Sequence, residues 1–258
     1  MKIRLFEVPH FDDFPLTFGG LLLNLKKLDQ LEYTCDVVCF SRSNYLCRDE
    51  EGNRDTSEKR VQYATGIRVI EEENCLKYLG VKHLILLGLD EALLRGYGLT
   101  GTKFEFPKGI DWNKDKHLVE YLTEIFKKHL QFADEVYFPL AIRGHVDHLI
   151  VREAGLKAVK ELDSAGIRRA SVFFGEDQPY AGTTDPEDWL EVEEFIKENK
   201  LEAITYEIDL EEKLKLLEFY PSQTEPTYFE GVRKRALQLK KQISSEKPAE
   251  RIYKYPEK

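Results

Sequence analysis

The sequence lacks the features that mark membrane-spanning and nucleic-acid-binding proteins. None of its apolar runs approaches the ~18–20 residues that a membrane-spanning helix needs. Positive charge is in deficit, because 47 Asp and Glu residues outnumber 38 Lys and Arg residues and give a formal net charge of −9. Proteins that bind nucleic acids usually carry a dominant basic surface. We therefore expect no membrane span and no nucleic-acid partner.

Cysteine is also scarce and irregularly spaced. The four cysteines, at positions 35, 39, 47 and 75, form neither paired C-x-x-C zinc knuckles nor a dense disulfide framework. They are interpreted as ordinary buried thiols. The N-terminal residues 1–7 lack the basic segment and apolar core of a signal peptide, so a cytoplasmic location is expected.

Segments with the two-residue period of strands alternate with segments of helical period along most of the chain. Strands are expected at residues 2–8, 34–40, 83–89, 135–140, 171–174 and 203–208, and helices at 16–31, 57–79, 113–130, 146–162, 210–219 and 226–243. Such alternation is typical of parallel β-α-β units. The sequence predicts an α/β fold, in which residues 1–258 form a single Rossmann-like layered domain with a mostly parallel sheet flanked by helices.

Three segments fall outside this alternation. Residues 91–112 and 176–188 are expected to be long loops that shape substrate specificity, since loops of this length in compact domains are usually functional or disordered. The tail after residue 244 is charged and contains proline, and it is expected to be peripheral.

The first candidate site follows the first predicted strand, where the sequence reads Pro9-His10-Phe11-Asp12-Asp13. One histidine and two carboxylates offer the nitrogen and oxygen donors that suit Zn²⁺. Adjacent aspartates cannot easily bind one ion from the same side, so one is expected to bind while the other acts as a base. The alternative is helix capping, because an aspartate at a helix N-terminus accepts hydrogen bonds from unpaired N–H groups.

The second candidate site, His145-Val146-Asp147-His148, follows the fourth predicted strand. His145 and His148 are three residues apart and share a face if a helix has begun. Ligands of open α/β sheets bind at the carboxyl ends of the strands. Because both clusters occupy such ends, the predicted fold can bring them together.

These residues resemble the signature of the LmbE-like, or PIG-L, N-acetylglucosaminyl deacetylases. That family carries (A/P)-H-P-D-D-E after its first strand and H-P-D-H later, and residues 9–14 here read PHFDDF while residues 145–148 read HVDH. Further matches are Gly19-Gly20, the R-x-x-E pair Arg68 and Glu71 before LGV at 79–81, Asp90, FGEDQPY at 174–180 and KLKLLEFYPSQ at 213–223. The ordered series spans roughly residues 3–223.

The resemblance implies a zinc-dependent hydrolase that removes the N-acetyl group from an N-acetylglucosamine-type sugar or glycoconjugate. In the matching positions, His10, Asp13 and His148 are the expected ligands of Zn²⁺ or of another divalent metal. Asp12 is the expected general base, His145 the group that stabilises the oxyanion, and Asp147 a residue that supports or orients His145. Arg68 and Asp90 are expected to contact the substrate, the alternatives being a surface ion pair and a helix cap. Relatives of this kind also make a homo-oligomer conceivable.

Two other functions stay open. One is a metal-dependent amidase that acts on a different N-acylated small molecule. The other is a binding-only α/β protein for a sugar, which is favoured by Phe14 at the position where the family usually has an acidic residue. A nucleotide-binding protein is disfavoured, because neither G-x-G-x-x-G nor a P-loop sequence is present.

Overall fold

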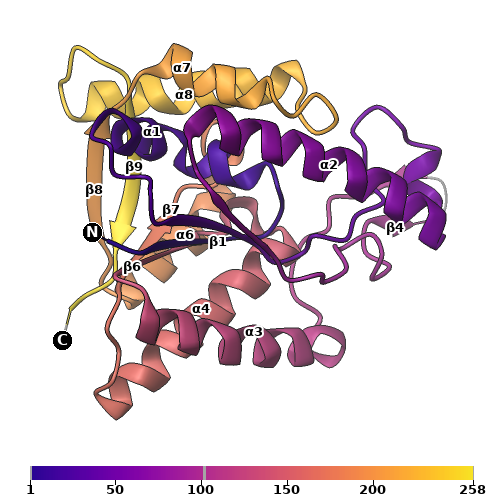
Figure 1. Ribbon diagram of the computed structural model, residues 1–258, viewed down its shortest axis with the longest axis horizontal. Helices are drawn as coiled ribbons and strands as arrows, with labels where there is room; N and C mark the ends of the chain where they lie inside the picture. Colours follow the sequence, from indigo (N-terminus) through magenta and orange to yellow (C-terminus); the bar gives the residue numbers. More distant parts are fainter. Residues whose placement is uncertain (1, 101–102, 258) are drawn as a thin grey trace.

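The computed structural model describes residues 2–100 and 103–257 and contains a seven-stranded sheet at its centre (Figure 1). Its order is β3-β2-β1-β6-β7-β9-β8. The strands are β1 (Arg4–Val8), β2 (Thr34–Val38), β3 (His83–Leu86), β6 (Glu135–Pro139), β7 (Ser171–Gly175), β8 (Glu202–Glu207) and β9 (Ala249–Lys254). The five neighbouring strands β3, β2, β1, β6 and β7 pair in parallel, whereas β9 is antiparallel to both β7 and β8. The predicted α/β class with a mostly parallel sheet is confirmed.

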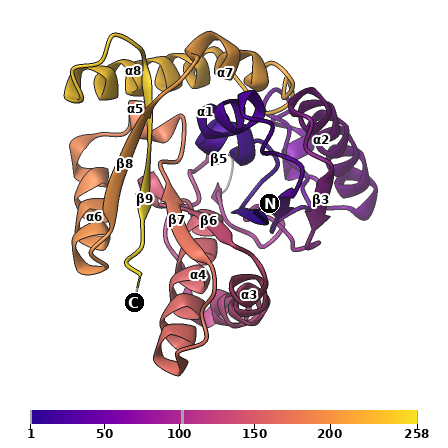
Figure 2. The same ribbon diagram turned by 60° about the vertical axis from the view of Figure 1, so that its left-hand side comes forward.

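Helices cover both faces of the sheet and make a three-layered molecule (Figures 1 and 2). One face packs against α1 (Asp13–Lys27), α2 (Glu58–Leu79), α7 (Leu210–Leu217) and α8 (Pro226–Gln242). The other face packs against α3 (Trp112–Phe132), α4 (Val146–Ala165) and α6 (Pro186–Glu198). Within the described part of the chain, no helix combines the length and apolar character that crossing a membrane requires.

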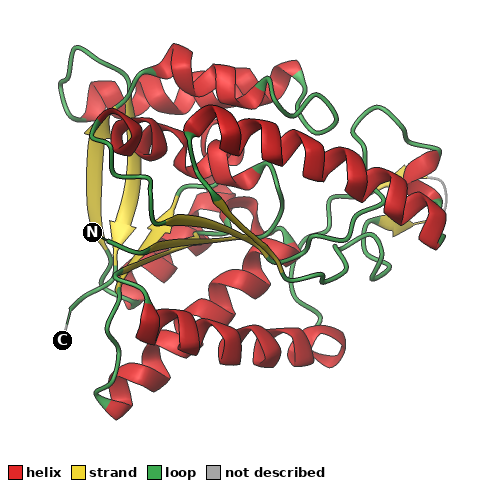
Figure 3. Ribbon diagram, in the orientation of Figure 1, coloured by secondary structure: helices red, strands yellow, loops and turns green. Residues whose placement is uncertain are grey.

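The remaining elements are short and lie in connections, as the loops in Figure 3 show. They are the 3-10 turns η1 (Gly52–Arg54) and η2 (Ile142–Gly144), the helix α5 (Tyr180–Thr183) and the hairpin strands β4 (Leu99–Thr100) and β5 (Lys103–Phe104). The hairpin lies within the long loop expected at residues 91–112, and α5 lies within the loop expected at 176–188.

Alternating side chains of each central strand fill two separate hydrophobic cores. In β1, Leu5 points into the core beneath α3 and α4, while its neighbour Phe6 points into the core beneath α1 and α2. Val37 and Val38 of β2 divide in the same way. Successive strand residues face opposite sides of a sheet, so strands buried on both faces place apolar residues in both cores. The charged residues Glu7 and Asp36 of these strands are also fully buried.

The C-terminal tail differs from the expectation. The prediction that residues after 244 are peripheral is wrong, because β9 inserts between β7 and β8. Its Glu250 is almost fully buried, forms an ion pair with the equally buried Lys213, and accepts hydrogen bonds from the main-chain N–H groups of Gly20 and Leu21 at 3.1 and 3.0 Å. The residue type alone does not show whether a charged residue is exposed or is buried in an ion pair. The sequence of β9 therefore reads as an exposed, charged tail.

Helix α6 also differs from the expectation, because it begins at Pro186, within the loop expected at residues 176–188. Seven of its thirteen residues are charged in the sequence PEDWLEVEEFIKE. Its apolar residues Trp189, Val192 and Ile196 recur at spacings of three and four and pack on the core. The helical period is therefore present in the sequence, within a strongly charged segment.

The order of the strands places the two sequence motifs side by side. The chain runs outward from β1 through β2 to β3, then returns to β6 on the other side of β1 and continues to β7. Neighbouring connections therefore leave β1 and β6 in opposite directions. Such a switch point opens a crevice at the carboxyl ends of the two strands, where ligands bind.

The Gly19-Gly20 pair of α1 has a packing role that mutation can test. A Cβ atom at Gly20 would lie 2.4 Å from Cγ2 of Ile208 and 3.0 Å from Oε2 of Glu250. We expect Gly20→Ala to lower the free energy of unfolding by about 1–3 kcal/mol, as overpacking does. Urea unfolding monitored by circular dichroism measures this change.

Gly66→Ala is the matched control. Gly66 is also helical, lies in α2, and would place a Cβ in open space. There alanine should stabilise the protein by about 0.5–1 kcal/mol through its helix preference. Equal effects of the two substitutions would contradict the packing role of Gly20.

Candidate active site

The turn that follows β1 presents two adjacent carboxylates to the carboxyl end of the sheet. Oδ2 of Asp13 accepts a hydrogen bond from the main-chain N–H of His10 at 2.9 Å. This bond fixes the side chain of Asp13, the first residue of α1. Asp12 stands at the N-cap position, but its side chain makes no capping hydrogen bond. The capping alternative is therefore wrong for Asp12, whose carboxylate lines the cavity instead.

The connection from β6 to α4 carries the second motif. It passes through η2, where Ala141, Arg143 and Gly144 all have positive φ angles, and α4 then begins at Val146. His145 is the N-cap, and its Nδ1 accepts a hydrogen bond from the main-chain N–H of Asp147 at 3.2 Å. His148 lies in the first turn of α4 and is almost fully buried.

Three donors from the two motifs converge. Oδ2 of Asp13 lies 3.2 Å from Nδ1 of His10 and 3.3 Å from Nε2 of His148. All three ligand atoms lie within 4.8 Å of one another and their residues are buried. Two imidazoles and one carboxylate form the donor set of catalytic divalent-metal sites, which keep a position open for water or substrate. The residues present therefore fit a divalent metal.

A second group, His10, His145 and Asp147, also meets the distance requirement for a metal. Both carboxylate oxygens of Asp147, however, already accept hydrogen bonds within the protein. Asp147 accepts hydrogen bonds from Arg95 at 2.7 Å and from the main-chain N–H of Ala92 at 2.9 Å, besides its contact with His10. We therefore favour the group that contains Asp13.

A carboxylate orients each of the two histidines. Asp147 contacts Nε2 of His10 at 2.9 Å, and Asp177 contacts Nδ1 of His148 at 2.5 Å. Such contacts set the tautomer, so that Nδ1 of His10 and Nε2 of His148 face Asp13 as electron-pair donors. The carboxylate of Asp147 orients His10, and its main-chain N–H donates to Nδ1 of His145. The role of Asp147 in supporting or orienting His145 stays a prediction.

The electrostatics of the cluster favour a bound cation. Burial lowers the pKa of His10, but Asp13 and Asp147 outweigh burial and raise this pKa to about 10. Burial would raise the pKa of Asp13, yet His148 and His10 hold it at about 2. Protons on the histidines thus balance the buried carboxylates when no metal is bound. A divalent ion can take their place, since metal binding displaces protons from its ligands.

Arg68 is brought to the site, but protein carboxylates already bind its guanidinium. Its Nη2 lies 3.2 Å from Oδ1 of Asp12, and its Nη1 lies 3.0 Å from Oε2 of Glu91. All three side chains are buried and line the cavity, so this is not the surface ion pair of the alternative reading. Burial and Asp13 raise the pKa of Asp12, and Arg68 opposes them.

Asp90 is the one predicted site residue that the structure does not bring to the others. Its carboxylate accepts a hydrogen bond from Arg42 at 2.8 Å on the exposed surface, and it does not line the cavity that contains His10. The neighbouring Glu91 points into that cavity. A role for Asp90 in substrate contact stays a prediction.

Phe14, at the position where the family usually has an acidic residue, lies in the core and not in the cavity. It is fully buried and packs edge-on against Phe6, with ring centroids 5.2 Å apart. It is absent from the cavity lining, whereas Asp12 and Asp13 both belong to it. The substitution therefore enlarges the core beneath α1 without removing any of the three donors.

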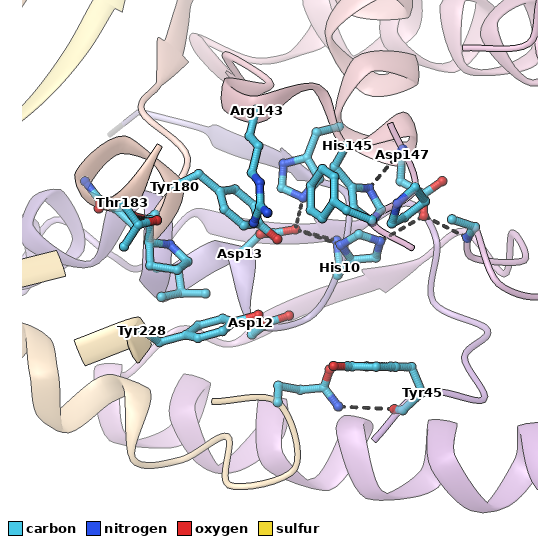
Figure 4. A pocket seen from close by; sticks show the side chains of 18 of the residues that line it. His10, Asp12, Asp13, Tyr45, Arg143, His145, Asp147, Tyr180, Thr183 and Tyr228 are labelled. Atoms are coloured by element: carbon cyan, nitrogen blue, oxygen red, sulfur yellow. Dashed lines mark hydrogen bonds and ion pairs between the residues drawn. The ribbon is translucent and has the colours of Figure 1, made fainter. Parts of the chain in front are cut away.

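A cavity of about 550 Å³ opens over the donor set (Figure 4). Its volume lies in the range of small-molecule sites. Tyrosines 45, 180 and 228 line its wall together with Phe106, which suits the apolar face of a sugar ring. Residues from β1, β6 and β7 connections and from α8 contribute to this one space.

Sequence reasoning missed Asp177, Glu91 and Arg95. Asp177 lies in the segment FGEDQPY, which is part of the family resemblance. Glu91 directly follows Asp90, the residue predicted to contact the substrate. Their partners in the site are distant in the sequence: Glu91 meets Arg68, Asp177 meets His148 and Arg95 meets Asp147. Only the folded geometry identifies which carboxylate meets which cation.

Comparison with known proteins identifies the family to which this chain belongs. The family model of the GlcNAc-PI de-N-acetylases (PIG-L) matches residues 5–159, which include all three donors. The chain belongs to the PIG-L family. Membership confirms the predicted class, a metal-binding hydrolase of the N-deacetylase type.

Relatives support the same assignment. A 2'-N-acetylparomamine deacetylase from Streptomyces fradiae is 29% identical over 224 residues, covering 84% of this chain and 72% of the relative. A teicoplanin deacetylase in its zinc-inhibited form superimposes with a TM-score of 0.69 at 18% identity and 97% coverage of both chains. An N,N'-diacetylchitobiose deacetylase from Pyrococcus horikoshii gives 0.59 at 19% identity, with 99% of this chain and 84% of that chain covered. At such identities the two structures show the shared fold.

The contact between Asp177 and His148 predicts the effect of a single substitution. Asp177→Asn removes the charge that orients and polarises the imidazole, and loss of such a partner typically costs about 10–100-fold in metal affinity. We expect the dissociation constant for Zn²⁺, measured by competition with a chromogenic chelator, to rise by this factor.

Asp163→Asn is the matched control for this prediction. Asp163 pairs with Arg168 at 2.5 Å at the far end of α4, away from the cavity. It should leave Zn²⁺ affinity unchanged. Wild-type affinity in Asp177→Asn, or an equal loss in both variants, would contradict the orienting role.

Proposed function

We propose that this chain is a zinc-dependent hydrolase that removes the N-acetyl group from an N-acetylglucosamine-type sugar or glycoconjugate. The convergence of His10, Asp13 and His148 beneath a cavity of sugar-binding size carries the proposal. We further propose that residues 1–258 form one deacetylase domain. A cytoplasmic location and a homo-oligomer stay predictions.

Zinc is the proposed metal because of the donor chemistry. Two neutral imidazoles and a carboxylate suit Zn²⁺, and the three protein ligands leave an open position, although another divalent ion could bind there. When bound, zinc supplies a Lewis acid for the amide carbonyl and lowers the pKa of a bound water to about 7.

Asp12 is the proposed general base. Its carboxylate adjoins Asp13 and lines the cavity, and Arg68 holds one of its oxygens at 3.2 Å. Burial raises the pKa of Asp12 above its ordinary value, which strengthens it as a general base. In the proposed reaction Asp12 removes the proton from the attacking water and delivers it to the nitrogen of the leaving amine.

His145 is the proposed donor to the amide oxygen. Burial lowers the pKa of His145 well below its ordinary value, so the ring is neutral. Its Nδ1 accepts the hydrogen bond from the N–H of Asp147, which leaves the proton on Nε2. A neutral N–H donor of this kind stabilises negative charge that develops on the carbonyl oxygen during attack.

The sugar part of the proposal is supported by the relatives and by the cavity wall. The curated relative is named for an N-acetylated aminosugar compound, and one structural neighbour for N,N'-diacetylchitobiose. Tyr45, Tyr180 and Tyr228 supply the aromatic surface on which a pyranose ring packs. An amidase for other N-acylated small molecules is the competing function.

Replacement of the general base is the decisive test. We expect Asp12→Asn to lower kcat for acetate release from N-acetylated aminosugars by about 10²–10⁴-fold, the contribution typical of general acid–base catalysis. Zinc content, measured by mass spectrometry of the purified protein, should not change, because Asp12 is not among the proposed ligands.

Asp90→Asn is the matched control, because Asp90 lies outside the cavity. Its kcat/KM should stay within about threefold of wild type, as expected for a surface substitution. A large loss would restore the predicted contact between Asp90 and the substrate.

The same assays separate the competing functions. Hydrolysis of other N-acyl compounds without acetate release from any sugar would favour the amidase. Absence of all turnover, together with sugar binding that Asp12→Asn leaves unaltered, would favour the binding-only protein.

A further inference from the structure

Arg143 occupies an unusual backbone conformation at the edge of the cavity. Its φ angle is 68°, in the left-handed region, and Ala141 two residues earlier has a φ of 60°. Left-handed conformations cost a non-glycine residue about 1–2 kcal/mol and concentrate at functional sites. This backbone aims the Arg143 side chain from the η2 turn into the cavity above Asp13 (Figure 4).

Two aromatic rings hold the guanidinium of Arg143 in place. Its Cζ lies 4.2 Å from the ring centroid of Phe106 and 5.6 Å from that of Tyr180. Within residues 2–100 and 103–257 it has no hydrogen bond and no ion pair, whereas Arg68 binds two carboxylates in the same cavity. A stacked guanidinium without a carboxylate is preorganised for an anionic ligand.

Two unsatisfied polar atoms line the same cavity. Gln178 is only 5% exposed, and its buried Oε1 has no hydrogen-bond partner among the described residues. Oγ1 of Thr184 is likewise buried and unpartnered in that part of the chain. Leaving a buried polar atom unpaired costs about 1–3 kcal/mol, so a hydroxyl-bearing ligand would relieve both atoms.

These residues belong to the same two connections that build the metal centre. Arg143 precedes His145 by two residues, and Gln178 directly follows Asp177, the partner of His148. The ring of Phe106 lies 5.4 Å from His145 and 5.7 Å from Tyr180, measured between centroids. Arg143 is therefore separated from the proposed oxyanion donor by a single side chain.

We propose that Arg143, Gln178 and Thr184 form a recognition subsite for an acidic N-acetylated aminosugar. Arg143 binds the carboxylate or phosphate of the substrate, and Gln178 and Thr184 bind its hydroxyl groups. The subsite deepens the deacetylase function and rests on it. The cavity would thereby select substrates in which an anionic group lies close to the acetamide.

Two acidic residues that line the cavity, Asp185 and Asp188, could instead bind a cationic aminosugar, which is the competing ligand. Asp188 is paired with Lys108 at 2.6 Å, so its charge is already balanced. Asp185 is exposed and stands at the N-cap of α6, where the partial positive charge of the helix end accounts for it. Asp188 is already neutralised, whereas Arg143 has no ion pair among the described residues, which favours the anionic ligand.

Calorimetry on the zinc-loaded Asp12→Asn protein tests the subsite while slowing turnover. The probes are N-acetylglucosamine 1-phosphate, N-acetylmuramic acid and the neutral methyl glycoside of N-acetylglucosamine. Adding Arg143→Gln should weaken binding of the anionic probes by about 10–100-fold, the value of a charge-assisted hydrogen bond, and leave the neutral probe within about threefold. Comparison of the two acids tells phosphate from carboxylate recognition.

Two further variants sharpen the result. Arg169→Gln is the matched control, since Arg169 is exposed and pairs with Asp134 outside the cavity. It should leave all three affinities unchanged. Gln178→Leu should weaken the neutral and the anionic probes alike, by about 3–30-fold, because the amide is assigned to hydroxyl groups that all probes share.

Equal effects of Arg143→Gln on neutral and anionic probes would overturn the proposal. Tighter binding of N-monoacetylchitobiose, which carries a free amine, than of either acid would overturn it as well. Binding is measured apart from turnover, so the two hypotheses fail separately. Anion selectivity that depends on Arg143 would survive a finding of no acetate release, and acetate release would survive loss of the subsite.

Discussion

Buried negative charge at the carboxyl ends of β1 and β6 is the constraint around which this molecule is organised. A carboxylate removed from water costs several kcal/mol unless a cation or hydrogen-bond donors compensate it. Every carboxylate of the centre accordingly has a basic partner within hydrogen-bonding distance. The pairs are Asp12 with Arg68, Glu91 with Arg68, Asp13 with His10 and His148, Asp147 with His10 and Arg95, and Asp177 with His148.

This network gives the two histidines their direction. Each is held on one nitrogen by a carboxylate behind it, and each turns its other nitrogen toward Asp13. The surplus of carboxylates over permanent cations makes the centre electrostatically suited to a divalent ion. Arg143 lies outside this balance, since no carboxylate of the described chain reaches it, and this separates substrate recognition from the support of the metal centre.

Much of the site was predictable because its chemistry is local in sequence. His10, Asp12 and Asp13 lie within four residues, as do His145, Asp147 and His148, and both groups follow apolar strands. The partners that orient them were not predictable. Asp177 meets His148 and Asp147 meets His10 across the switch point, and composition cannot tell which of many acidic residues makes such a contact.

Along the fold, the central parallel strands were recognisable as short, mainly apolar segments between segments of helical period, although they also bury charged residues such as Glu7 and Asp36. Strand β9 was not, since its charged Glu250 is buried by pairing with Lys213. Helix α6 was not, since seven of its thirteen residues are charged and its apolar residues stand among them. The sequence by itself determined the α/β class and predicted the three donors that the structure brings together, because periodicity and residue type carry that information. Only the tertiary structure decided that Asp147 orients His10 and that Glu91 rather than Asp90 meets Arg68. It also decided that Arg143 lines the cavity without an ion pair to any residue that the structure describes. Those facts depend on distances between segments far apart in the chain, which residue order does not contain.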